Sequence, residues 1–306
     1  MSKKFTLYWS NFKYYEECPR KFLWYRGWEG IELGAGPGRS KPKPENFSEH
    51  HILMGKVIQK VIELMYNNEL WRKPATLKTQ LEKLTKQHFE FEMGKSYIDW
   101  KKSPARLDLY RTCLDGVLGY LSTMKHHRLI GSYARAEKDL VAYINDYVPI
   151  GGRVDLMIRR EDTGLSILDG KNGKHKDKYL DPNQLRWYGL CFYLCYGKLP
   201  DRLGWAYYRF PYGMINPVTQ EVEPGVEWIE FSLDDLKGLA KRALEVRKFM
   251  DQHKFDPTPT PNVCRWCEYQ TICPERIEQK NKNRKIKKLD NPLPGNTKGG
   301  FSFDDL

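Results

Sequence analysis

The chain has 306 residues, enough for one large domain or two small ones with a substantial core. Its formal net charge of +12 favours a polyanionic partner, nucleic acid before a membrane surface. Seven cysteines, without the spacing of a secreted disulfide scaffold, indicate a reducing environment. No apolar run approaches the ~20 residues of a membrane span, and the first ten residues lack the apolar stretch of a signal peptide. We therefore expect a cytoplasmic protein that does not bind membranes.

The first part of the chain has helical patterns. A helix rich in aromatic residues is predicted over residues 10–26, and it carries Cys18. A segment of Gly, Pro and Lys over 34–44 is expected to be a mobile loop. Ser48 is a candidate N-cap for a helix whose apolar residues recur at helical spacing up to Met65. Two further helices are predicted over residues 77–91 and 104–127.

The pattern then changes to short, partly alternating segments that are typical of strands. Strands are predicted over residues 134–144, 152–160, 165–171, 204–210 and 226–231. Asp181, followed by Pro182 in the first turn, marks the start of a helix that runs to about residue 196. Ser232 and Asp235 form a capping box that opens a helix to about residue 252. This order predicts an α/β fold, in which helices flank a mixed central sheet.

Changes in composition divide the chain into five predicted parts. They are an N-terminal segment (1–47), a helical region inserted before the strands (48–130), an α/β core (131–255), a cysteine lobe (256–276) and a basic tail (277–306). The tail is rich in lysine and is expected to be disordered.

Four cysteines near the two ends of the sequence form a candidate metal centre. Cys264, Cys267 and Cys273 have the spacing C-x2-C-x5-C, and Cys18 lies in the run EECPRKF. Thiolates select iron–sulfur clusters or zinc, and ligand type alone does not separate the two. If the four share one centre, both ends of the chain meet there, and the centre is mainly structural. The other cysteines, Cys113, Cys191 and Cys195, are expected in the core.

A second group of polar residues lies on two neighbouring predicted strands. Asp169 and Lys171 are two residues apart on one strand, so they share a face. Asp155 lies on the preceding strand, and Glu137, one strand earlier, is a further candidate carboxylate. Asp155 can face Asp169 or Lys171 only if the connecting turn, predicted over residues 161–164, holds an odd number of residues or a bulge.

Two carboxylates with the main-chain carbonyl of Gly170 are suitable ligands for Mg²⁺ or Mn²⁺. A metal ion of this kind lowers the pKa of a bound water and stabilises charge on a phosphodiester during cleavage. Lys171 could orient that water and offset the growing negative charge. On the next predicted helix, Gln184 and Tyr188 are four residues apart and therefore lie on one face.

The motifs GRVDL, ILDGK and QLRWY follow one another in this order, between a CP near the start and the C-x2-C-x5-C near the end. In this arrangement the chain resembles the iron–sulfur branch of the RecB-like PD-(D/E)XK nucleases. That branch includes the CRISPR-adaptation exonucleases and the AddB nuclease domain. The resemblance covers residues 8–273, and its order of motifs is more specific than any single motif.

The resemblance implies a restriction-endonuclease-like nuclease core over residues 131–255 and a C-terminal iron–sulfur lobe. It implies a 4Fe–4S cluster held by the four cysteines, Cys18, Cys264, Cys267 and Cys273. It also implies that Asp155 and Asp169 bind the metal, that Lys171 is catalytic, and that Gln184 and Tyr188 lie near the substrate.

One departure from the family pattern concerns the metal site. The family commonly has a histidine ligand in G-x-x-x-H on an early helix, whereas here Gly55 is followed by Gln59. His51 is eight residues before Gln59, about 12 Å along a helix axis, so it is a poor replacement. Gln59 could bind metal weakly through its carbonyl or through water. The number of metal ions and the preferred metal are therefore left open.

We expect a metal-dependent DNA nuclease, acting as an exonuclease on single-stranded or fraying ends in recombination, repair or replication. A compact nuclease of this kind suits a prokaryote or a phage. One alternative is a catalytically idle DNA-end-binding subunit of the same fold, which Gln59 mildly favours. Another is a zinc-stabilised RNA-binding or scaffold protein. The terminal FSFDDL is a candidate docking peptide for a replication or recombination protein.

Overall fold

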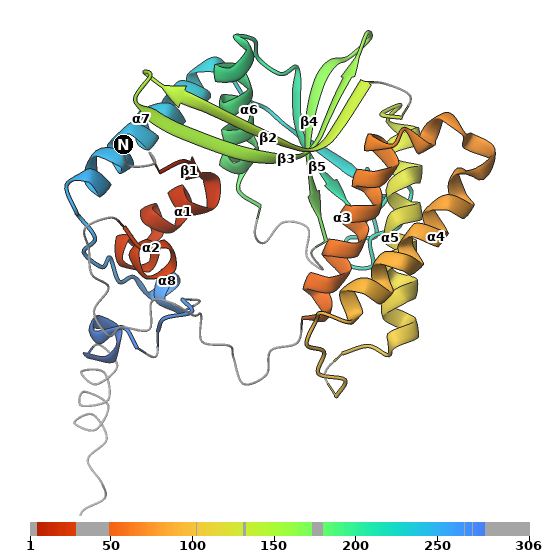
Figure 1. The fold of residues 1–306 in the computed structure, drawn as a ribbon, viewed down its shortest axis with the longest axis horizontal. Coiled ribbons are helices and arrows are strands. Elements are labelled where there is room, and N and C mark those ends of the chain that lie inside the picture. The colour runs from red at the N-terminus through yellow and green to blue at the C-terminus, as the bar shows by residue number, and fades with distance from the viewer. Residues whose placement is uncertain are drawn as a thin grey trace, which may run out of the picture. The chain divides into compact units, whose positions relative to one another are not determined.

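The computed structural model describes residues 5–28, 49–101, 103–130, 133–172, 180–265, 267–270 and 272–278 (Figure 1). The chain divides into two compact units. The first, here called the sheet unit, comprises Met1–Phe12 and Lys43–Lys248; the second, the cysteine unit, comprises Lys13–Pro42 and Phe249–Leu306. Ser48, the predicted loop over 34–44 and the predicted disordered tail from residue 279 onward lie outside the described residues.

The described part of the sheet unit contains a six-stranded sheet with the order β1-β3-β4-β5-β6, in which β2 also pairs with β3. Its strands are β1 (Leu7–Tyr8), β2 (Tyr133–Ile144), β3 (Val148–Arg160), β4 (Gly164–Lys171), β5 (Arg202–Tyr207) and β6 (Val226–Ile229). The pairs β1–β3 and β4–β5 are parallel, and the other pairs are antiparallel. The predicted mixed sheet flanked by helices is therefore confirmed, although β1 was not predicted.

The helices are α1 (Trp9–Glu17), α2 (Pro19–Arg26), α3 (His50–Asn67), α4 (Pro74–Met93), α5 (Arg106–His126), α6 (Pro182–Tyr196), α7 (Leu233–Asp251) and α8 (Pro261–Arg265), with a 3-10 turn η1 (Leu70–Arg72). The single helix predicted over 10–26 is wrong, because the chain breaks at Cys18, whose backbone is extended (φ −167°, ψ 111°). Pro19 disfavours helical backbone at the residue before it and suits the first position of α2. Within the described ranges, none of the helices combines the length and the apolar character needed to cross a bilayer.

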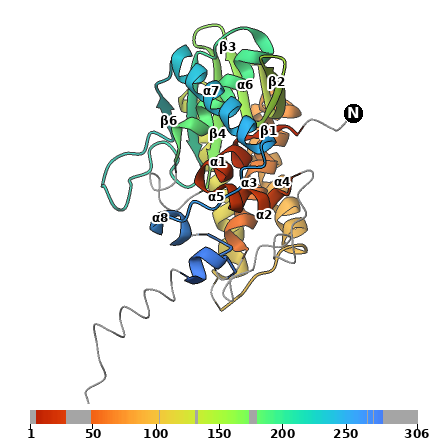
Figure 2. The ribbon, with the colours of Figure 1, turned by 90° about the vertical axis from the view of Figure 1, so that its left-hand side faces the viewer.

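Two groups of helices bury the apolar faces of the sheet. The helices α3, α4 and α5 pack together (Figure 1), and their core side chains, such as Ile58, contact Leu156 of β3 and Leu168 of β4 through one cluster. Helix α6 packs on β2, β3, β4 and β5, and Figure 2 shows it beside α7 in front of the strands. Trp187 of α6 is fully buried, and its Nε1 donates to Gly151 O (3.0 Å). The sheet is thereby held between apolar helix faces.

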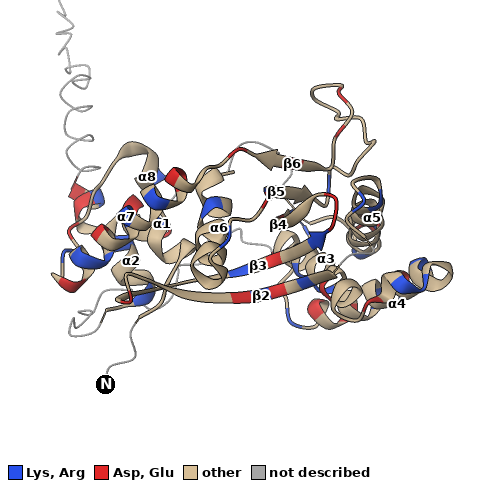
Figure 3. Cartoon of the chain, turned by 90° about the horizontal axis from the view of Figure 1, so that it is seen from above, with Lys and Arg blue, Asp and Glu red and all other residues tan. Residues whose placement is uncertain are grey.

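The hairpin between β3 and β4 decides the register of the polar residues. Arg160 pairs with Gly164, so the turn holds three residues instead of the predicted four. Gly164 has φ +70°, the left-handed conformation that often closes a three-residue hairpin loop. The ladder extends to the pair of Leu156 and Leu168, and the next residues in the same register are Asp155 and Asp169. Figure 3 shows acidic positions in the middle of β2 and β3. The odd-numbered turn required by the sequence analysis is therefore confirmed.

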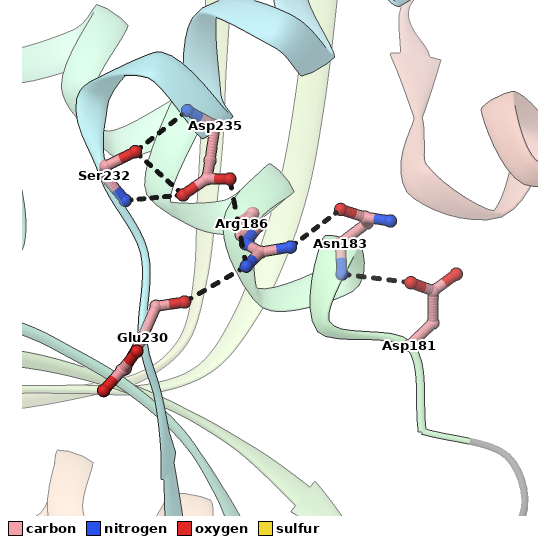
Figure 4. A network of polar contacts seen from close by, with 6 residues as sticks. All are labelled: Asp181, Asn183, Arg186, Glu230, Ser232 and Asp235. Atoms are coloured by element: carbon pink, nitrogen blue, oxygen red, sulfur yellow. Dashed lines mark hydrogen bonds and ion pairs between the residues drawn. The ribbon is translucent and has the colours of Figure 1, made fainter.

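Side chains cap the first turns of α6 and α7 (Figure 4). A carboxylate oxygen of Asp181 accepts a hydrogen bond from Asn183 N (3.0 Å). Ser232 and Asp235 form a reciprocal box, in which Ser232 N donates to Asp235 Oδ2 (2.8 Å) and Asp235 N to Ser232 Oγ (3.2 Å). Both predicted helix starts are confirmed. Arg186 of α6 lies 3.9 Å from Asp235 Oδ1 and so links the two helix ends.

The capping box allows a test of local stability. Replacing Ser232 with alanine removes the oxygen that accepts from Asp235 N, so we expect the free energy of unfolding to fall by about 1 kcal/mol. Urea denaturation followed by circular dichroism measures this change. Ser232→Asn keeps a side-chain acceptor at the N-cap and should lose much less. Equal losses in the two variants would show that the capping hydrogen bond is not the cause.

Candidate functional site

Four predicted polar residues form one network of hydrogen bonds and an ion pair in the sheet unit, and a fifth, Asp155, lies on the neighbouring strand. Lys171 Nζ lies 2.5 Å from Asp169 Oδ2 and donates to Gln184 Oε1 (3.0 Å). Gln184 Nε2 in turn donates to Asp169 Oδ1 (3.1 Å) and to the hydroxyl of Tyr188 (3.2 Å). Asp155 of β3 and Asp169 of β4 are the next residues beyond the last pair of their ladder, Leu156 and Leu168. Gln184 of helix α6 therefore holds the Lys171 ammonium group beside the Asp169 carboxylate.

Asp155 is held from two sides. Its Oδ2 accepts a hydrogen bond from Gly170 N (2.8 Å), and its Oδ1 accepts one from Gln59 Nε2 (3.2 Å). Gly170 also leaves space for Tyr208, because a Cβ at this position would lie 1.8 Å from the Tyr208 hydroxyl oxygen. Gly170, whose carbonyl was predicted to bind metal, thus contacts the Asp155 carboxylate through its N–H.

Gln59 of α3 joins Asp155 to a third carboxylate. Gln59 Nε2 donates to Glu137 Oε1 (2.6 Å) as well as to Asp155. Its amide nitrogen, and not the carbonyl predicted as a weak metal ligand, therefore faces the carboxylates. His51 contributes its main-chain carbonyl, which accepts from Asn172 Nδ2 (3.4 Å) just after Lys171.

The site carries buried negative charge with limited compensation. Burial raises the pKa of Asp155 well above its ordinary value, the charge of Asp169 raises it further, and the Gly170 N–H partly opposes the shift. Burial also raises the pKa of Asp169, against the lowering effect of Lys171. Desolvation and the nearby carboxylates raise the pKa of the Tyr208 hydroxyl, which stays neutral. Such a site favours a cation.

The donor set is compatible with Mg²⁺ or Mn²⁺. Its ligands are hard oxygens, and Asp169 Oδ2 is a buried oxygen that accepts no hydrogen bond within the described residues, although it is ion-paired with Lys171. Within the same ranges, no three His, Cys, Asp or Glu side chains are arranged to hold one ion. Mg²⁺ is commonly bound through one or two carboxylates, with water and substrate phosphate completing its shell. Asp155 and Asp169 could supply those carboxylates.

In the cysteine unit, one pocket is lined by all four predicted thiols and by three cationic side chains. These residues are Cys18, Cys264, Cys267 and Cys273, with Arg20, Lys21 and Arg276. The four cysteines form no disulfide. Burial raises the pKa of the Cys267 thiol, whereas Lys21 lowers it. The pocket therefore offers sulfur ligands close to positive charge.

Hydrogen bonds and ring contacts hold the two segments of the cysteine unit together. The Tyr15 hydroxyl donates to Lys254 O (2.5 Å), and Arg20 Nε donates to Phe255 O (3.0 Å). The rings of Trp24 and Tyr269 lie 5.4 Å apart. Segments more than two hundred residues apart thus line the same pocket. Trp266, beside the cysteines in sequence, lies outside the described residues.

The other cysteines do not line this pocket, and one of them corrects the sequence analysis. Cys113 and Cys191 are buried as predicted, but Cys195 is exposed because it lies in the last turn of α6, beyond the edge of the core. Sequence reasoning also missed Tyr208 and the joint contact of Gln59 with Asp155 and Glu137. No local pattern marks these residues, because their partners are distant in the chain.

No curated protein matches the chain. Among solved structures, the one titled "Crystal structure of SSO0001" is similar to this chain, with 14% sequence identity and a TM-score of 0.34. The alignment covers 74% of this chain and 95% of that chain. A likeness of this degree carries no argument about function.

A family model gives a stronger result. The model described as the PD-(D/E)XK nuclease superfamily matches residues 9–274, which is most of the chain. The matched span includes both the carboxylate site and the four pocket cysteines. Members of this superfamily are generally nucleases that use Mg²⁺ or Mn²⁺, which agrees with the oxygen-rich donor set found here. Because the match covers most of the sequence, the chain belongs to the PD-(D/E)XK nuclease superfamily.

Proposed function

We propose that this protein is a deoxyribonuclease that hydrolyses phosphodiester bonds with Mg²⁺ or Mn²⁺ bound by Asp155 and Asp169. One observation carries the proposal. The half-buried Asp155 and the buried Asp169 are the next residues beyond the last pair of the β3–β4 ladder, and Lys171 Nζ lies 2.5 Å from Asp169 Oδ2. Membership in a nuclease superfamily supports assigning this arrangement to phosphodiester cleavage.

Each residue of the site has a role that follows from its contacts. Asp155 and Asp169, with the Gly170 carbonyl, would hold the metal, which when bound polarises water and phosphate. Lys171 can orient the attacking water and offset negative charge that develops on the phosphate. Gln184 holds both Lys171 and Asp169, so it positions the ammonium group. The Tyr188 hydroxyl is held by the same amide at the edge of the site.

The preferred substrate is proposed to be single-stranded or fraying DNA ends, cleaved by an exonuclease mechanism in recombination, repair or replication. The resemblance to the RecB-like exonucleases and the net charge of +12 support a DNA substrate. An idle end-binding subunit would have the same fold. The ion pair of Lys171 with Asp169, together with Asp155 held against the Gly170 N–H, favours an active enzyme over that alternative.

We also propose that the cysteine pocket holds a 4Fe–4S cluster. Four thiols line one pocket, and Arg20, Lys21 and Arg276 would balance the negative charge of a thiolate-bound cluster. Four thiols would also suit a structural zinc ion, so the preference for iron–sulfur rests on the resemblance to the iron–sulfur nucleases. The cluster would join distant segments and stabilise the fold.

Substitutions at the carboxylate site test the nuclease proposal. Asp169→Asn or Lys171→Ala should lower cleavage of end-labelled DNA at least about 100-fold, because each removes a charge that contacts the reacting groups. Single- and double-stranded substrates with Mg²⁺ or Mn²⁺ also reveal the preferred end. Asp162→Asn changes an exposed carboxylate in the β3–β4 turn and should keep full activity. Equal DNA loss with wild type and Asp169→Asn would mean that the activity does not belong to this site.

The raised pKa values of Asp155 and Asp169 predict how metal binding depends on pH. Each carboxylate takes up a proton at a higher pH than an exposed aspartate, whose pKa is about 4. Because protons compete with metal, Mn²⁺ affinity should already fall at a pH above the range in which an ordinary carboxylate takes up a proton. Calorimetric titration at several pH values measures this. An affinity that stays constant until the ordinary carboxylate range would contradict the shifts.

The same shifts have a consequence for the metal-free protein. A raised folded-state pKa means that the folded chain binds more protons than the unfolded chain. These two groups should therefore make the unfolding free energy fall as the pH rises from about 4 towards their folded-state pKa values. Urea unfolding at several pH values in the presence of a chelator tests whether the unfolding free energy falls as the pH rises. Added Mn²⁺ should restore stability most strongly at the higher pH.

The cluster assignment is tested by purification under anaerobic conditions. Wild-type protein should be brown and contain iron and sulfide, and Cys264→Ser should lose both and unfold more easily. Cys195→Ser is a matched control, because that exposed thiol does not line the pocket. It should keep the cluster. Colourless protein that contains zinc would favour the zinc-stabilised alternative instead.

A further inference from the structure

Glu137 has an unusual backbone for a residue in the middle of a strand. Its φ is 53°, which is left-handed, while Ala136 and Lys138 on either side keep the same register with β3. No residue is inserted, but the alternation of burial is interrupted, because Lys138 is exposed between buried Ala136 and Leu140. A left-handed residue other than glycine costs roughly 1–2 kcal/mol. Tertiary contacts must therefore hold Glu137 in place.

The contact that holds Glu137 also holds Asp155. Gln59 Nε2 carries two hydrogens, which are donated to Glu137 Oε1 (2.6 Å) and Asp155 Oδ1 (3.2 Å). The neighbouring α3 residues Ile58 and Ile62 are buried, so the helix fixes the position of the amide. Gly170 N holds the other Asp155 oxygen. The orientation of Asp155 thus depends on a bridge that Glu137 anchors.

Glu137 also completes the charge of the site. Asp155, Asp169 and Glu137 carry three negative charges when ionised, and Lys171 carries one positive charge. Their total of −2 matches one divalent cation. The other charged side chains near Glu137 on α3, Lys60 and Glu63, pair with each other at 2.7 Å and cancel. Without Glu137 the site would carry only −1.

We propose that Glu137 is a positioning residue of the metal site, which orients Asp155 through the Gln59 amide and brings the charge of the site to that of one divalent cation. The proposal rests on the metal-dependent function proposed above. In this proposal Gln59 is not a metal ligand. It is a hydrogen-bond donor that holds the carboxylates of Glu137 and Asp155 together.

The first test measures Mn²⁺ binding to the full chain by calorimetry, without DNA. Glu137→Gln should weaken Mn²⁺ binding about 10- to 100-fold, the range found when groups that orient metal ligands are removed. Asp139→Asn is the matched control, because it removes the same charge two residues further along β2. Asp139 is exposed and paired with Arg153 (2.9 Å), so its loss should leave the affinity nearly unchanged. Equal affinity of Glu137→Gln and wild type would overturn the proposal.

A second variant separates positioning from a merely structural role. Glu137→Gly removes the side chain and relieves the left-handed strain, so the melting temperature without metal should stay the same or rise. Mn²⁺ binding should nevertheless weaken as it does in Glu137→Gln. A glycine variant that binds Mn²⁺ like wild type would show that only the backbone conformation matters, and would overturn the proposal.

The dependence on Gln59 is tested by a double-mutant cycle. If Glu137 acts through the amide, the effects of Glu137→Gly, which removes the acceptor, and Gln59→Ala on Mn²⁺ affinity should be less than additive. If the two effects on Mn²⁺ affinity are fully additive, Glu137 does not act through the Gln59 amide, and the proposed positioning role is overturned. Cleavage assays run beside these titrations keep the two proposals distinct. A protein that binds Mn²⁺ with the expected differences but cuts no DNA contradicts the nuclease function alone, and wild type that binds no Mn²⁺ overturns both.

Discussion

The site depends on two like charges, the half-buried Asp155 and the buried Asp169, that lie in register on adjacent strands. The three-residue turn between β3 and β4 sets this register, so Asp155 and Asp169 cannot separate without shifting the whole hairpin. A slip of one residue would turn every side chain of a strand to the other face, moving apolar residues such as Leu156 and Leu168 out of the core. The hydrophobic core therefore enforces a charge arrangement that would be unfavourable by itself.

The surroundings of the two aspartates reduce this cost without removing it. Lys171, the Gly170 N–H and the Gln59 amide each donate to or pair with one carboxylate oxygen. The donors come from β4 and α3, two elements that are packed into the same core. The pKa values of both aspartates nevertheless remain raised. Ionised carboxylates that remain destabilised in this way are typical of sites to which a cation binds.

The cysteine unit is organised on a different principle. Its two segments are distant in sequence and contribute few long elements, so hydrogen bonds such as Tyr15 to Lys254 O and ring contacts such as Trp24 with Tyr269 hold them together. A thiolate-bound centre in the pocket would add strong bonds where apolar burial is limited. The sheet unit is stabilised by its apolar core, whereas the cysteine unit has a pocket lined with thiols.

The sequence by itself determined the features that depend on neighbouring residues. Periodicity located the main helices and strands, Asp181 and the Ser232–Asp235 box located two helix starts, and residue spacing selected the polar residues of the site. Only the tertiary structure decided the left-handed Glu137, the Gln59 bridge and the fit of Tyr208 against Gly170. These features depend on partners from other strands and helices, whose distance and orientation are set by packing of the whole core and leave no periodic trace in the chain.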